Sequence, residues 1–360
     1  ERVMLVDAET EAQMVDLVAQ RAADVPEGDW IVGWGWDDGA WAANYPDMRL
    51  LSERIPDHPV FMMSLHGFAA WGNQLAFERA GITASTESPA GGEIVRDRYG
   101  NPTGILLNQA TNLLADAVPV PSLEQLKDRV EEGLLAMAQD GYVAVHEAGA
   151  YSDLMQAFED LHAEGRLPIR VYAMPRDLDT ALMQKWHETG PWTSAENMLS
   201  VLTVKAFFDA ALGSRGALLL DDYADRPGHR GVSGNEYGFD ESLLTEMAAA
   251  GFQLSIHAIG DSGNRATLEF LESVIEAVPE SRELRHRIEH AQVLHPDDIP
   301  RFAASNIIAS MEPVHAVEDK GWAEARLGSE RVRGAYAWRS LRETGARLAF
   351  NSDLAGSDHN

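Results

Sequence analysis

The sequence predicts an α/β protein organised around a (β/α)8 barrel, and two observations carry this prediction. From about residue 140 onward, seven short apolar segments follow one another, and each except the last is followed by a helical pattern. Apolar strands that alternate with helices are typical of a parallel sheet covered on both faces. A doubly wound sheet would also fit, but six or more consecutive units favour a barrel. The eighth strand of such a barrel is missing.

The seven predicted strands are short, apolar and mostly rich in β-branched residues. They are residues 142–150, 168–174, 199–210, 252–261, 285–294, 306–314 and 347–353. A helix over about 122–140 leads into the first of them. We therefore assign residues 121–360 to the barrel.

The first 120 residues follow a different pattern. Residues 1–26 begin with a charged amphipathic helix that lacks the apolar region of a signal peptide. Strand-like segments rich in Trp follow, and then a stretch punctuated by Gly and Pro that is typical of hairpins. We interpret residues 27–120 as an inserted α+β subdomain.

Composition narrows the classes of partner. The 360 residues carry a formal net charge of −28, which repels nucleic-acid phosphates and anionic membranes. No apolar run approaches the roughly 20 residues that span a bilayer. We therefore expect a small-molecule substrate, no nucleic-acid or membrane partner, and a cytoplasmic location. Because Cys is absent, any metal must be held by His, Asp, Glu or a modified Lys.

Several predicted strands carry a potential metal ligand at or near their ends: Lys205, His257, His290 and Asp353. Each of them also has a purely structural interpretation. A His at a strand end is often only hydrogen-bonded, a Lys can extend its amine to the solvent-exposed rim of the barrel, and an Asp can cap the following helix. Together at one end of a barrel they are better explained by a bound cation. Imidazole and carboxylate groups are suitable ligands for Zn²⁺, and a Lys that has reacted with CO₂ becomes an oxygen ligand.

The order Lys, His, His, Asp on successive strands resembles the amidohydrolase superfamily of metal-dependent hydrolases. The closer match is its amidohydrolase-3 branch, which includes N-substituted formamide deformylases. The resemblance rests on "VKAFFDAALGSRGA", "LSIHAIGDSGNRA", "RHRIEHAQVLHPDDIPRFA", "MEPVHA" and "LAFNSDLAGSDHN", and on "GWGWDDGAW", "HGFAAWGNQLAFERAGI" and "GGEIVRDRYGNPTGIL" in the insert. These segments span nearly the whole chain.

The resemblance implies a role for each residue. Lys205 would be carboxylated and bridge two divalent metals, most simply Zn²⁺. His257 and His290 would complete the shell of the more exposed metal. Asp353 would bind the more buried metal and act as general base towards the bridging hydroxide, in keeping with the chemistry of metal-activated water. The resemblance is also compatible with a homodimer.

One feature of the family is missing. Its barrel begins with a strand that ends in His-x-His and supplies two ligands to the buried metal, whereas this sequence contains no His-x-His. Residues 1–26 resemble the helix that follows that strand, and the family's terminal β-sandwich is absent. We therefore expect an internal fragment in which the exposed half of the metal site is complete and the buried half is not.

Four further residues are candidates for substrate or second-layer roles near the barrel mouth. His146, with Glu147, ends the first predicted strand, and His315 ends the sixth. Each could contact substrate or be structural. Asp261 follows His257 by four residues and could orient a ligand, although a helix N-cap is the simpler interpretation.

The other candidates lie in loops. Arg215 sits in a Gly-flanked segment and could bind a substrate carboxylate, with a surface ion pair as the alternative. His66 and Trp71 lie in the insert among other aromatic residues, which form either a lid over an apolar substrate or a small core.

The sequence thus predicts metal-dependent hydrolysis of a C–N bond in an amide, an N-substituted formamide or a cyclic amide. Two alternatives remain open. One is a non-catalytic, metal-binding scaffold, and the other is an ester or lactone hydrolase on the same barrel.

Overall fold

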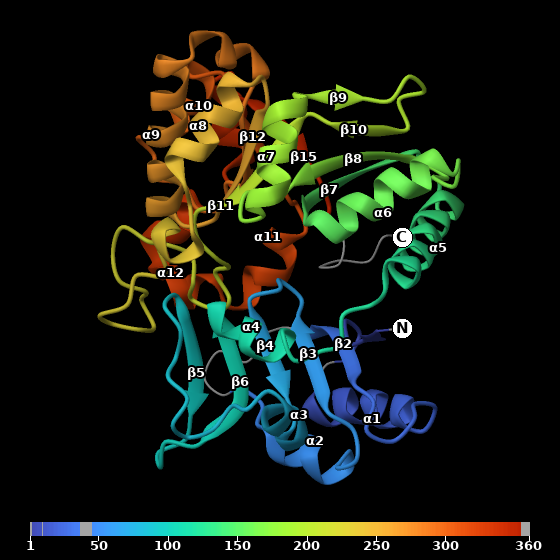
Figure 1. Ribbon diagram of the computed structural model, residues 1–360. Coiled ribbons are helices and arrows are strands. Elements are labelled where there is room, and N and C mark those ends of the chain that lie inside the picture. Colours follow the sequence, from blue (N-terminus) through green and yellow to red (C-terminus); the bar gives the residue numbers. More distant parts are fainter. Residues whose placement is uncertain (1, 9, 37–44, 354–360) are drawn as a thin grey trace.

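The computed structural model describes residues 2–8, 10–36 and 45–353, which form a mixed α/β fold in two parts (Figure 1). An N-terminal part contains a six-stranded mixed sheet, and the remainder contains parallel strands that alternate with helices. The ends of two family-like motifs, residues 37–41 and 354–360, lie outside the described residues. No helix of the described chain is long and apolar enough to cross a membrane.

The N-terminal sheet has the strand order β1-β2-β3-β4-β6-β5, with β1, β2 and β3 parallel and the other neighbours antiparallel. Its elements are β1 (Val3–Met4), α1 (Glu11–Ala22), β2 (Ile31–Trp36), α2 (Met48–Arg54), β3 (Val60–Ser64), β4 (Ala69–Gly72), α3 (Gln74–Arg79), β5 (Gly92–Arg96), β6 (Pro102–Asn108), the 3-10 helix η1 (Gln109–Thr111) and α4 (Asn112–Ala115). The helix predicted within residues 1–26 is present as α1. It packs on this sheet, because Met14 and Val18 share a core with Trp36 and Trp71.

All seven predicted strands of the second part are present, and each lies beside the preceding one. The strands are β7 (Ala144–Ala150), β8 (Arg170–Pro175), β10 (Leu199–Val201) with β11 (Thr203–Phe207), β12 (Gln253–Ala258), β13 (Arg287–His290), β14 (Ile308–Met311) and β15 (Arg347–Phe350). They form two sheets, β7-β8-β10 and β11 to β15, joined by a parallel bridge between Arg176 and Lys205. A short antiparallel strand, β9 (Trp192–Thr193), extends the first sheet.

Barrel closure stays a prediction. Within the described residues, no strand pairs with the outer edge of β7 or of β15. These two strands are also more exposed than the strands between them. The mixed α/β fold with successive parallel strands is therefore confirmed, whereas a closed (β/α)8 barrel is not shown.

Helices cover the parallel strands, as Figure 1 shows. They are α5 (Leu123–Gln139), α6 (Ser152–Ala163), α7 (Thr180–Thr189), α8 (Glu241–Ala249), α9 (Asp261–Ala277), α10 (Ile299–Ala304), α11 (His315–Glu318), α12 (Ala323–Arg331) and α13 (Trp338–Glu343), with 3-10 helices η2 (Gly234–Tyr237), η3 (Pro279–Leu284), η4 (Asp319–Gly321) and η5 (Val332–Gly334). The amphipathic α9 buries Leu268, Leu271 and Val274 in the same core as Ile256 and Ile288 of the strands. Each such side chain contributes about 1.5–3 kcal/mol of burial free energy.

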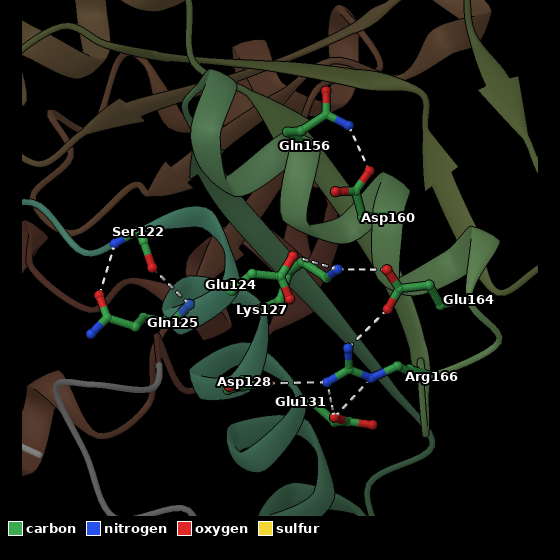
Figure 2. A network of polar contacts seen from close by, with 10 residues as sticks. All are labelled: Ser122, Glu124, Gln125, Lys127, Asp128, Glu131, Gln156, Asp160, Glu164 and Arg166. Carbon is green, nitrogen blue, oxygen red and sulfur yellow. Dashed lines mark hydrogen bonds and ion pairs between the residues drawn. The ribbon is translucent and has the colours of Figure 1, made fainter.

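The helix predicted at about 122–140 is α5, and charged side chains tie it to the end of α6 (Figure 2). Lys127 is buried and pairs with Glu124 at 3.2 Å and with Glu164 at 2.5 Å. Arg166 pairs with Glu131 at 2.5 Å and also contacts Glu164 at 2.8 Å. The network therefore fixes α5 beside α6, and residues of α5 form part of the wall of the cavity described next.

Candidate functional site

A cavity of about 1150 Å³ lies at the carboxyl ends of the parallel strands, and the N-terminal part closes one side of it. The loop between β3 and β4 reaches this wall. The ring of Phe68 lies 5.4 Å from that of His257, and the ring of His66 lies 5.5 Å from that of His315. The predicted site residues that line the cavity are Lys205, His257, His290, Asp353, His146, His315 and His66.

Strand alternation explains why several of these side chains share the cavity. Neighbours in a parallel ladder point to the same face, and the ladder pairs Phe207 with His257 and His257 with Glu289. Lys205, two residues before Phe207, is on this face too. His290 follows Glu289 and would point the other way in a regular strand, but its φ of 73° breaks the alternation and brings it into the cavity. Such strained backbone is concentrated at functional sites.

Lys205 and His257 are almost fully buried, with 3% and 2% of their surfaces exposed. The Lys205 Nζ atom lies 4.4 Å from the centre of the Phe207 ring, and the His257 ring stacks on Phe207 at 4.8 Å. Within the described chain, neither Lys205 Nζ nor His257 Nε2 has a hydrogen-bond partner. Burial lowers the pKa of Lys205 to about 8 and holds the pKa of His257 well below its usual value. Both groups can therefore be neutral, as a metal ligand or an amine that reacts with CO₂ must be.

His290 lies 4.4 Å from His257, measured between ring centres, and its Nδ1 atom is 2.9 Å from Glu312 Oε2. Burial opposes protonation of His290, but Glu312 and Asp353 outweigh it and raise its pKa. Ligand atoms of His290, Glu312 and His315 lie within 4.8 Å of one another, a spacing that suits a metal ion. Burial and the neighbouring His290 lower the pKa of His315 to about 2, so its ring is neutral.

Charged residues that the sequence analysis did not single out surround this cluster. Glu289 accepts hydrogen bonds from Ser255 and Arg287, each at 2.7 Å. Although burial favours its neutral form, Arg287 and Lys205 lower the pKa of Glu289 to about 2. Arg176 lies 4.0 Å from the Phe207 ring centre and pairs with Asp177. The guanidinium groups of Arg176 and Arg287 thus line the cavity together with Lys205 and the carboxyl group of Glu289.

Asp209 is a second buried carboxyl group that was not predicted. It accepts hydrogen bonds at 2.9 Å from the backbone N–H groups of Leu218, Ile259 and Gly260. Burial raises its pKa to about 7 in spite of these donors. Its Oδ1 atom lies 3.6 Å from His257 Nε2, so Asp209 ties the loop after β12 to the histidine.

The residues on the two outer strands are less enclosed. His146 stacks on Tyr172 at 4.5 Å between ring centres, but its own surface is exposed. Asp353 follows β15 and is exposed as well. Burial, and then the charge of Asp353, raises the pKa of Glu147. Residues after β15 and residues of β7 therefore face the same space across the unpaired edges.

Three predicted residues lie outside the cavity lining. Asp261 begins α9 and accepts hydrogen bonds from the N–H groups of Leu220 and Ser262. The Arg215 Nη2 atom pairs with Asp225 at 2.8 Å, as the ion-pair alternative proposed. Trp71 is fully buried in the N-terminal core and donates to the Asp47 carbonyl at 3.2 Å.

The sequence contained a usable signal for some of the missed residues. Glu289 and Glu312 both lie in quoted motifs, and Glu289 is two positions from the Arg287 with which it pairs. Period-two alternation along the strands could have placed Glu289 beside His257. Asp209 also lies in a quoted motif, but its hydrogen-bond partners lie on a distant loop and on the segment after β12, so the sequence does not show its contact with His257.

The fold and the cavity define an α/β protein with metal-ligand side chains gathered at the ends of parallel strands. The sequence profile of the amidohydrolase family, in its amidohydrolase-3 branch, matches residues 5–359. The chain belongs to this family.

Three comparisons illustrate the similarity. The chain is 33% identical over 368 residues to Protein LONG AFTER FAR-RED 3 of Arabidopsis thaliana, covering 96% of this chain and 60% of that protein. It is 26% identical to the N-substituted formamide deformylase of Arthrobacter pascens, covering 95% and 64%. The crystal structure of an uncharacterized metal-dependent hydrolase from Pyrococcus horikoshii OT3 matches with a TM-score of 0.71 and 24% identity, covering 98% and 67%. The chain thus spans about three fifths of the length of the two relatives.

Proposed function

We propose that this chain carries the metal-binding part of a hydrolase that cleaves a C–N bond in an amide, an N-substituted formamide or a cyclic amide. One observation carries the proposal. Two buried atoms without hydrogen-bond partners, Lys205 Nζ and His257 Nε2, lie with His290 in one cavity of an amidohydrolase-family fold. Buried polar atoms normally have partners, so atoms left without one are candidates for ligand binding. A cavity of this size suits a small-molecule substrate.

The donor set fits a divalent metal, most simply Zn²⁺. Lys205, His257, His290 and Asp353 would hold it, with Lys205 carboxylated. When bound, such an ion lowers the pKa of water and polarises the scissile carbonyl group.

Other side chains in the cavity would transfer the proton and exclude water. Asp353 is an exposed carboxylate at the cavity, suited to accept a proton from the attacking water and return it to the leaving amine. Phe68 and Phe207 provide apolar surface that excludes water beside His257. We propose that the N-terminal part shapes the substrate pocket through this wall.

The test begins with metal content. Elemental analysis of the purified protein, supplied with zinc and bicarbonate, is expected to find bound zinc, and the His257→Ala/His290→Ala double variant is expected to lose it. Amides, formamides and matched esters are then assayed with the loaded protein. Zinc that is retained by the double variant would refute the ligand assignment, and binding without turnover of any substrate would favour a non-catalytic scaffold.

A further inference from the structure

One carboxylate oxygen faces two imidazole rings at the carboxyl end of β14. Glu312 is buried, with 3% of its surface exposed, and its Oε2 atom lies 2.9 Å from His290 Nδ1 and 3.6 Å from His315 Nδ1. The two rings are nearly parallel, with planes 24° apart and centres 5.8 Å apart. Both rings therefore direct Nδ1 towards Glu312, and both Nε2 atoms lie on the far side of their rings.

This arrangement determines which ring nitrogen has a lone pair available for a metal ion. A carboxylate only accepts hydrogen bonds, so the Nδ1 atom of His290, at 2.9 Å, carries the hydrogen in a neutral imidazole, whereas the 3.6 Å to His315 Nδ1 is too long for a hydrogen bond. The Nε2 atom then keeps its lone pair. Metal-bound histidines commonly donate their other ring nitrogen to a carboxylate in this way, which fixes the ring orientation and raises its basicity as a ligand.

We infer that Glu312 is a positioning residue that orients the ring of His290 so that its Nε2 atom is available to a metal ion. The inference rests on the proposed function, in which His290 is a metal ligand. Glu312 then sets the affinity for the metal without being a ligand.

The backbone shows why His290 needs such a partner. Its φ of 73° takes it out of the regular strand, so the alternation of side chains along β13 does not set the direction of its ring. The contact with Glu312 supplies that constraint from the neighbouring strand. His315 is held on another side by His66, whose ring lies edge-on at 5.5 Å. The N-terminal part therefore contributes to the same arrangement.

The experiment compares zinc affinity in three variants of the whole chain. Glu312→Gln keeps the size of the side chain but removes its charge and one acceptor oxygen. Glu272→Gln is the control, because Glu272 likewise accepts side-chain hydrogen bonds, in its case from the Arg301 guanidinium, but does not line the cavity. His290→Ala tests the ligand itself. Zinc dissociation constants are measured by competition with a chromophoric chelator, and Co²⁺ absorption spectra report the ligand set.

For Glu312→Gln we expect the zinc dissociation constant to rise about 10–100-fold, with an unchanged Co²⁺ spectrum at saturation. Glu272→Gln is expected to bind as the parent protein does. An unchanged affinity in Glu312→Gln would overturn the inference, and so would a Co²⁺ spectrum that shows one ligand fewer, because Glu312 would then bind the metal directly. If His290→Ala binds zinc normally, the proposed metal centre is wrong. If only His290→Ala loses zinc, the metal centre stands and the role of Glu312 is wrong.

Discussion

The amino and carboxyl ends of the parallel strands pair their buried polar groups to different extents. At the amino ends, the Tyr172 hydroxyl meets Thr203 Oγ1 at 2.6 Å, and Thr203 donates to Gln253 Oε1 at 2.8 Å. Gln253 in turn donates to two backbone carbonyls, and His286 Nδ1 accepts from the Leu254 N–H at 3.0 Å. Tyr172, Thr203 and Gln253 are thus linked side chain to side chain, whereas His286 Nε2 has no hydrogen-bond partner in the described chain.

At the carboxyl ends more of the buried polar atoms lack a hydrogen-bond partner. Lys205 Nζ and His257 Nε2 have no hydrogen-bond partner in the described chain, and His290 has a strained backbone. In barrel enzymes the amino ends of the strands serve stability and the carboxyl ends carry the chemistry. The difference between the two ends therefore separates residues expected to affect stability from residues expected to affect function.

The largest expected effect comes from replacing Lys205 by Met. If Lys205 is a metal ligand, hydrolytic activity falls by about 1000-fold or more. The metal-free variant is expected to be more stable by about 1–3 kcal/mol, because a buried amine without a partner gives way to an apolar side chain of similar size. Activity assays and urea unfolding measure the two effects. A Lys205→Met protein that is active and less stable would contradict the contrast between the two ends.

Substitutions at the amino ends are expected to lower stability and to leave metal binding unchanged. Thr203→Val keeps the shape of a fully buried side chain but removes the hydroxyl that links Tyr172 to Gln253. We expect the free energy of unfolding to fall by about 1–3 kcal/mol, because both partners lose a buried hydrogen bond. Metal affinity, measured in the same preparation, should not change. A variant that loses zinc but keeps its stability would show that Thr203 serves metal binding and not stability.

A pH series tests the amino ends separately. Burial lowers the pKa of His286 to about 4 from an ordinary 6.5, so the folded protein keeps this ring neutral. Its contribution to stability is therefore complete above pH 6.5 and is lost as the pH falls towards 4, at about 1.4 kcal/mol per pH unit. His286→Asn keeps an acceptor for Leu254 but does not titrate. The difference in free energy of unfolding between parent and variant should shrink by roughly 2 kcal/mol between pH 6.5 and 5, as measured by urea unfolding. A difference that stays constant over this range would show that His286 does not cause the pH dependence.

The smallest effect is expected for Arg215→Gln. Arg215 pairs with Asp225 outside the cavity, so zinc affinity and activity should stay within about twofold of the parent protein. A larger loss in either assay would mean that this loop reaches the substrate during turnover.

The sequence predicted the strands and part of the site for a clear physical reason. Apolar segments with helices between them reveal successive parallel strands, and those strands place Lys205 and His257 in one cavity through their alternation. His290 was named because it ends a strand, but its entry into the cavity depends on a positive φ that no local pattern predicts.

Other features depend on residues far apart in the chain. His66 meets His315 across about 250 positions, and only the packing of the N-terminal part on the parallel strands creates that contact. Trp71 was attractive as a lid residue because the sequence shows its aromatic neighbours but not which way they face. Its burial follows from the pairing of β4 with β3 and β6, which directs it into the N-terminal core.

The guanidinium groups of Arg176 and Arg287 line the cavity of a chain whose formal net charge is −28. The net charge repels an anionic ligand at long range, and attraction to these two groups acts only at short range inside the cavity. Added salt screens the long-range repulsion more than the short contacts inside the cavity, since the screening length is about 10 Å at 0.1 M. Association rates of anionic ligands should accordingly increase with ionic strength, whereas those of cationic ligands should decrease.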